Sequence, residues 1–187
     1  LDFNEGLIRA RLRSVCDMPI VEGADRVLNW ISKEKGKFAP LFGISLKNLE
    51  IKSLSAEKIS VPENPFELTI EEAKVIGTEN DETDTIWLGY YNEPRLIYTA
   101  PAFKKGPWKA SNRRTVHIAI DVFANKGTKL YAPMEGEVFT AEYRDSPLDY
   151  GGVVILKHTT PDNDEFFTLY GHLDPQFLDA LQVGDKI

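Results

Sequence analysis

His117 and Asp121 are the two residues of this chain whose types and spacing most clearly suggest chemistry. They stand four positions apart among β-branched residues that favour a strand. Residues i and i+4 of a strand point to the same face, so we expect one strand over 114–121 with both side chains on one face. An imidazole and a carboxylate are donors that a borderline cation such as Zn²⁺ prefers. The alternative is a buried histidine that pairs with a nearby carboxylate for packing alone.

Three short motifs follow this pair along the chain. They are Tyr131-Ala132-Pro133-Met134-Glu135-Gly136-Glu137-Val138, then Tyr170-Gly171-His172-Leu173, and finally Gly184-Asp185-Lys186-Ile187. By its spacing alone, His172 could be a third metal ligand. We interpret His158, which ends the apolar run from Val153, as a strand-end residue that makes hydrogen bonds.

The order H-x-x-x-D, Gly127, Y-A-P-x-x-G-x-V, Y-G-H-L and G-D-x-I resembles the lysostaphin-type zinc endopeptidase family. The resemblance covers about residues 114–187. It implies a fold of the duplicated-hybrid-motif type, a zinc ion bound by His117 and Asp121, and a catalytic role for His172 as a base or transition-state donor. It also implies a peptide substrate, which in this family is a peptide bond of bacterial cell-wall peptidoglycan.

The resemblance places the third zinc ligand outside this sequence. In the family, that ligand is the second histidine of a later H-x-H motif, and this chain contains no such motif. We therefore expect the third protein ligand downstream of Ile187, and we expect the chain to be a piece of a longer protein. A catalytic zinc ion needs three protein ligands and a water, so we expect the chain alone to bind zinc weakly and to turn over poorly.

A second hypothesis is a non-catalytic binding or regulatory module. Four short stretches also resemble the peptidase-like middle segment of large fusion proteins: Arg95-Leu96-Ile97-Tyr98, Arg114-Thr115-Val116-His117, Asp149-Tyr150-Gly151 and Tyr170-Gly171-His172-Leu173. Those proteins carry a kinase-like domain before it and a class III aminotransferase after it. The resemblance implies neighbouring domains as partners, a cytoplasmic location, and pyridoxal phosphate only in a fused domain outside this chain. Ala119, where the peptidase family usually has Gly, adds a methyl group beside the site.

Composition excludes several other classes of partner. The formal net charge is −7, from 22 Lys and Arg against 29 Asp and Glu, which argues against nucleic acid. No apolar run reaches transmembrane length, and we expect no membrane partner. The single cysteine, Cys16, cannot form an intramolecular disulfide. The residues at the start show no signal peptide, so the compartment stays open.

The hydrophobic pattern and the family resemblance together divide the chain into three parts and predict a mainly β protein. We expect a helical connector over 1–44, a small β-rich segment over 45–100, and a truncated lysostaphin-like peptidase domain over 101–187. Short strands with Gly- and Asn-containing turns predict a β-sandwich or open barrel. The expected helices are 4–16, 23–34 and a turn within 174–181. The expected strands are 49–52, 58–61, 85–91, 95–98, 114–121, 128–132, 136–143, 152–158 and 165–171.

Overall fold

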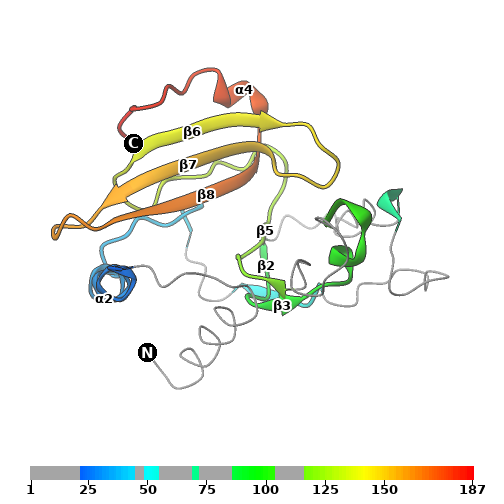
Figure 1. Cartoon of the computed structure of the whole chain (residues 1–187), viewed down its shortest axis with the longest axis horizontal. Helices are drawn as coiled ribbons and strands as arrows, with labels where there is room; N and C mark the ends of the chain where they lie inside the picture. Colours follow the sequence, from blue (N-terminus) through cyan, green and yellow to red (C-terminus); the bar gives the residue numbers. More distant parts are fainter. Residues whose placement is uncertain (1–21, 45–48, 55–68, 72–85, 104–115) are drawn as a thin grey trace.

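The computed structural model describes residues 22–44, 49–54, 69–71, 86–103 and 116–187 (Figure 1). The predicted helix over 4–16, Cys16 and the predicted strand over 58–61 lie outside the described residues. The helices are α2 (Ala24–Glu34) and α4 (Pro175–Leu178), with two 3-10 helices, η1 (Leu96–Thr99) and η2 (Pro101–Phe103). The strands are β1 (Glu50–Lys52), β2 (Trp87–Gly89), β3 (Glu93–Pro94), β4 (Val116–His117), β5 (Val122–Phe123), β6 (Glu137–Arg144), β7 (Gly151–Thr159) and β8 (Glu165–Leu173). The prediction of a mainly β protein is confirmed.

Strands β6, β7 and β8 form one long antiparallel sheet, which Figure 1 shows as the upper layer of the molecule. The predicted strands 136–143, 152–158 and 165–171 correspond to them and are confirmed. The central strand β7 is the most buried of the three, because it has a neighbouring strand along both edges. Its ladders with β6 and β8 set the register of these two strands.

The main hydrophobic core lies between this sheet and α4. Val138, Val154, Leu156 and Leu178 are its buried members. Helix α4 begins at Pro175, and the side chain of Asp174 accepts a hydrogen bond from the backbone N–H of Gln176, so the helix has a regular N-cap. The predicted helical turn within 174–181 is therefore confirmed.

The shorter strands form a separate layer in which β1, β2 and β5 make one sheet and β3 and β4 make another. Figure 1 shows β2, β3 and β5 together below the long sheet. Strand β1 runs parallel to β2, and β5 runs antiparallel to it. Trp87 of β2 stacks on Phe123 of β5 with ring centroids 3.7 Å apart. The strands are only two or three residues long, so side-chain contacts have to hold this layer together.

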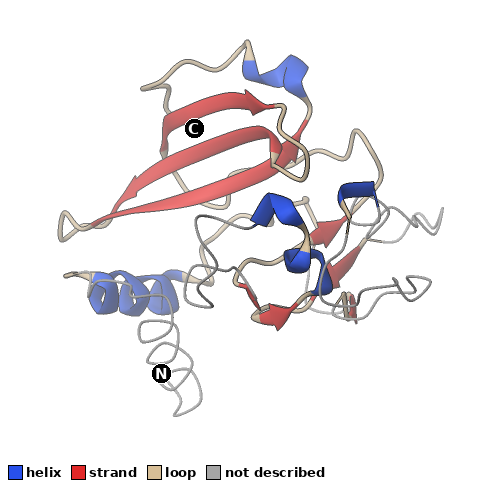
Figure 2. Ribbon diagram, turned by 45° about the vertical axis from the view of Figure 1, so that its right-hand side comes forward, coloured by secondary structure: helices blue, strands red, loops and turns tan. Residues whose placement is uncertain are grey.

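Helix α2 packs beside the turn that joins β7 to β8, as Figure 2 shows. Its predicted bounds, 23–34, agree with the structure. Trp30 meets Phe166 of β8 at 5.9 Å between ring centroids, and Arg26 forms an ion pair with Asp164 at 2.5 Å. Among the described residues, no helix has the length and hydrophobicity that crossing a membrane would require.

The predicted strands over 95–98 and 128–132 are wrong. Residues 95–98 are not a strand, because η1 begins at Leu96 and its side chains pack around the fully buried Ala100. A short apolar run does not distinguish these two conformations. Residues 128–132 are not a strand either. Tyr131 N–H donates to Leu41 O at 2.8 Å and joins this stretch to the segment around Leu41, and no ladder forms among the described residues.

Candidate metal centre

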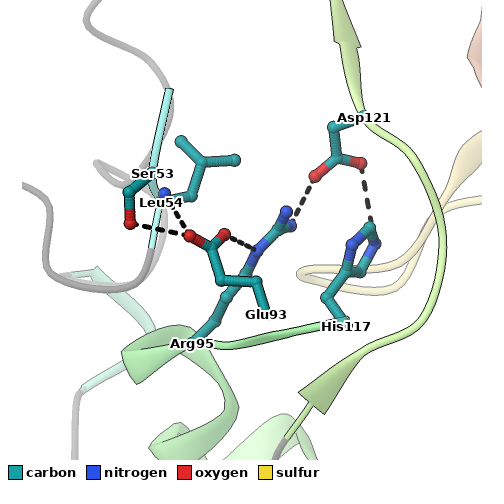
Figure 3. A network of polar contacts seen from close by, with 6 residues as sticks. All are labelled: Ser53, Leu54, Glu93, Arg95, His117 and Asp121. Carbon is teal, nitrogen blue, oxygen red and sulfur yellow. Dashed lines mark hydrogen bonds and ion pairs between the residues drawn. The ribbon is translucent and has the colours of Figure 1, made fainter. Parts of the chain in front are cut away.

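His117 and Asp121 come together at a break between two strands. His117 ends β4, Asp121 directly precedes β5, and the residues between them belong to no strand. Figure 3 shows the two side chains facing each other across this break. His117 Nε2 and Asp121 Oδ1 are 3.6 Å apart. Both side chains are partly buried, with 18% and 30% of their surface exposed.

The prediction of one strand over 114–121 is therefore wrong, although the two side chains do face each other. A strand rises about 3.3 Å per residue, so i and i+4 on one straight strand lie about 13 Å apart. Only a change of direction can bring their side chains into contact. The chain makes it at Ala119, and the flanking Ile118 and Ile120 are 51% and 62% exposed instead of alternating into a core.

Arg95 lies between Asp121 and a second carboxylate, Glu93 (Figure 3). Its Nη1 donates to Asp121 Oδ2, and its Nε donates to Glu93 Oε2 at 3.1 Å. Glu93 Oε1 accepts two more hydrogen bonds, from Ser53 Oγ at 2.7 Å and from the backbone N–H of Leu54 at 2.9 Å. A continuous polar network thus runs from the β1 end to the His117–Asp121 pair.

The network keeps Glu93 ionised although the side chain is buried. Burial is the largest influence on its pKa and raises it. The hydrogen bonds from Ser53, Arg95 and Leu54, together with the positive charge of Arg95, outweigh burial, so the pKa of Glu93 is lowered from its ordinary value. Arg95 and Glu93 have only 8% and 6% of their side-chain surface exposed, so they form a buried ion pair.

Strand pairing places this ion pair beside His117. Glu93 and His117 are directly opposite each other in the β3–β4 ladder. The ring of Tyr98, which is buried, lies 6.5 Å from the imidazole of His117 between centroids. The backbone N–H of Gly89 donates to the carbonyl oxygen of Asp121 at 2.9 Å. His117 and Asp121 are therefore both held by backbone contacts, His117 by strand pairing with Glu93 and Asp121 by the hydrogen bond from Gly89.

His172 lies near the end of β8, at an irregularity in the β7–β8 ladder. Its φ of 59° is left-handed, which is uncommon for a residue other than Gly. Its backbone N–H donates to Tyr150 O at 2.7 Å, and its exposed ring lies 6.3 Å from that of Tyr150. Such bulges re-aim a side chain. Within the described part of the chain, these contacts do not connect His172 to His117 or Asp121.

His158 is a structural hydrogen-bonding residue, as predicted. It is 2% exposed; Nδ1–H donates to the carbonyl oxygen of Glu135 at 2.7 Å, and Nε2 lies 2.8 Å from Thr168 Oγ1. A Cβ on Gly136 would lie 2.8 Å from the imidazole of His158, so this imidazole explains the glycine of the Y-A-P-x-x-G-x-V motif.

The chemistry of the His117–Asp121 pair fits a metal ion in part. Two ligands of a tetrahedral zinc ion lie about 3.4 Å apart, and the Nε2 and Oδ1 atoms of this pair are separated by nearly that distance. Among the residues that the structure describes, no group of three or more His, Cys, Asp or Glu side chains could hold a metal ion. The described residues thus supply two facing donors, and His172 is not the third.

A family model of Peptidase family M23 matches residues 115–187, which is under half of the chain. The matched range contains His117, Asp121 and His172 and nearly coincides with the range of the sequence resemblance. The match supports an M23 peptidase domain here and indicates a metallopeptidase-like function; this family is typically zinc-dependent. No curated protein and no solved structure matches the chain significantly.

The roles of Glu93 and Arg95 are not predicted from the sequence. Arg95 begins the expected strand over 95–98, and the sequence pattern assigns no function to either residue. The one available signal is a Glu and an Arg two residues apart beside apolar residues that become buried. That signal is weak, because such pairs are usually solvent-exposed.

Proposed function

We propose that this chain carries a zinc-dependent metalloendopeptidase-like domain that hydrolyses peptide bonds, with cell-wall peptides as the substrate class. The supporting observation is the facing pair of His117 Nε2 and Asp121 Oδ1, 3.6 Å apart, inside the range matched by the peptidase family. In this proposal His117 and Asp121 bind the metal, and the third protein ligand comes from the H-x-H motif expected downstream.

A bound zinc ion would polarise the peptide carbonyl and lower the pKa of a water molecule. The residues of the chain have separate tasks around it. His117 supplies a neutral nitrogen and Asp121 a negatively charged oxygen. His172 is exposed and held at a bulge, so a substrate can reach its ring. We assign it one of two tasks: as a base it would accept the proton that the attacking water loses, or as a donor it would hydrogen-bond to the developing oxyanion.

Zinc binding by wild type and three single variants tests the proposal. We expect weak binding of about one zinc ion per chain, lost in His117→Ala and in Asp121→Ala, because each removes a donor. His172→Ala is the matched control: it should keep the zinc and lose any cleavage of soluble cell-wall peptides. Calorimetric titration measures the first effect and chromatography of the products the second. Zinc binding that survives both ligand substitutions would contradict the proposal.

The second candidate is a non-catalytic binding or regulatory module. It is favoured by the finding that the described residues bring together two donors and no third. Peptide binding without zinc-dependent cleavage, unchanged in His172→Ala, would support it. The fusion with kinase-like and aminotransferase domains, a cytoplasmic location and a pyridoxal phosphate domain all stay predictions.

A further inference from the structure

We propose that Arg95 is a positioning residue of the metal centre: it holds Asp121 Oδ2 and thereby turns Asp121 Oδ1 toward His117, while Glu93 balances its charge. The effect of Arg95 on metal binding rests on the proposed function, in which His117 and Asp121 bind the metal. With this role, Arg95 and Glu93 belong to the metal centre, although both lie upstream of the segment that matches the peptidase family.

The contacts of Arg95 leave it little freedom. Its side chain is 8% exposed and bonded through Nε to Glu93 and through Nη1 to Asp121. Its Nη2 is buried, has no hydrogen-bond partner among the described residues, and would lie 3.3 Å from a Cβ on Gly89. A guanidinium that is fixed in this way presents a fixed donor to Asp121. Since one carboxylate oxygen is taken by that donor, the other oxygen is the one that faces His117.

Charge explains why Glu93 belongs to the arrangement. Arg95 alone would cancel the negative charge of Asp121 and weaken its attraction for a cation. With Glu93 ionised, the three side chains carry a formal charge of −1. The negative charge that a divalent metal ion needs is therefore restored, and Arg95 contributes orientation without neutralising the centre.

The anchor of this unit is distant in sequence. Glu93 is held by Ser53 Oγ and the backbone N–H of Leu54, just after β1. Asp121 is also held through its backbone carbonyl, which accepts from Gly89 of β2. The segments 50–54 and 86–95 thus orient a residue of the matched segment. Partners that orient metal ligands typically change metal affinity by about 10–100-fold when they are removed.

Zinc affinity of Arg95→Met, measured by calorimetric titration, is the first test. We expect affinity about 10–100-fold weaker than in wild type, with part of it restored in Arg95→Lys, which retains a donor. Arg144→Met is the matched control, since Arg144 also pairs with a carboxylate, Glu142, at 2.5 Å but on the exposed surface. Equal or tighter binding by Arg95→Met would overturn the proposal, and tighter binding would show that Arg95 competes with the cation.

A double-mutant cycle tests the contact without any metal. Arg95→Met and Asp121→Asn are combined, and the coupling in unfolding by denaturant is compared with that of Arg144→Met and Glu142→Gln. We expect stronger coupling for the buried pair. Coupling no greater than that of the exposed pair would overturn the positioning role. If wild type binds no zinc, the proposed function fails, and this cycle still decides whether Arg95 holds Asp121.

Discussion

The long β6–β7–β8 sheet and the short strands around His117 are stabilised in different ways. The sheet has strands of eight or nine residues and an apolar core against α4. The short strands have two or three residues each and are linked by a buried network of charges. The hydrophobic effect is non-directional, whereas hydrogen-bonded ion pairs depend on the orientation of donor and acceptor. Of these two regions, the one with the shorter strands is therefore the one in which side-chain contacts set the orientation of its residues.

Leu156→Ala should have the largest effect and should act on the sheet. Leu156 is 2% exposed in the main core, and its truncation leaves a cavity. We expect a loss of about 2–5 kcal/mol in the free energy of unfolding, measured by chemical denaturation. Leu169→Ala on the adjacent strand is the control, because Leu169 is 49% exposed and should lose far less. Equal losses in the two variants would contradict the assignment of the core.

Glu93→Gln should have an intermediate effect and should act on the charged network. It removes the charge that faces Arg95, and we expect a loss of about 1–3 kcal/mol at neutral pH. The folded pKa of Glu93 is lowered, so its contribution is complete above the ordinary pKa of 4.5 and is lost as pH falls through the folded value. The difference in stability between wild type and Glu93→Gln should therefore shrink on acidification.

Denaturant unfolding of both proteins from pH 7 down to pH 3 measures this difference. Glu165→Gln provides the matched control, since Glu165 is 56% exposed in its ion pair with Lys157. A difference for Glu93→Gln that grows at low pH would mean that Glu93 is not held as an anion.

Arg26→Ala should have the smallest effect and should weaken the contact between α2 and the turn that joins β7 to β8. The Arg26–Asp164 pair is largely exposed on the Arg26 side, so salt should screen it. We expect faster amide hydrogen exchange in α2 at low ionic strength and no difference from wild type at high ionic strength. A difference that persists in high salt would indicate that the contact is more than an exposed ion pair.

The two regions also differ in how well the sequence predicts them. Strands β6, β7 and β8 were predicted because their apolar residues repeat over many positions, and His158 was predicted from its place at a strand end. The His117–Asp121 pair was found from its chemistry, but its geometry was wrong, because a bend at Ala119 leaves no signal in the pattern. Glu93 and Arg95 were missed because their partners, Leu54 and Asp121, lie 39 and 26 positions away.

The left-handed backbone conformation of His172 lowers the free energy of unfolding of the protein. A residue other than Gly in this conformation costs about 1–3 kcal/mol, and Gly would adopt it without that penalty. We expect His172→Gly to unfold at a higher denaturant concentration than His172→Ala, although both lack the imidazole. Stability alone would favour glycine at this position, which agrees with the role proposed for the imidazole.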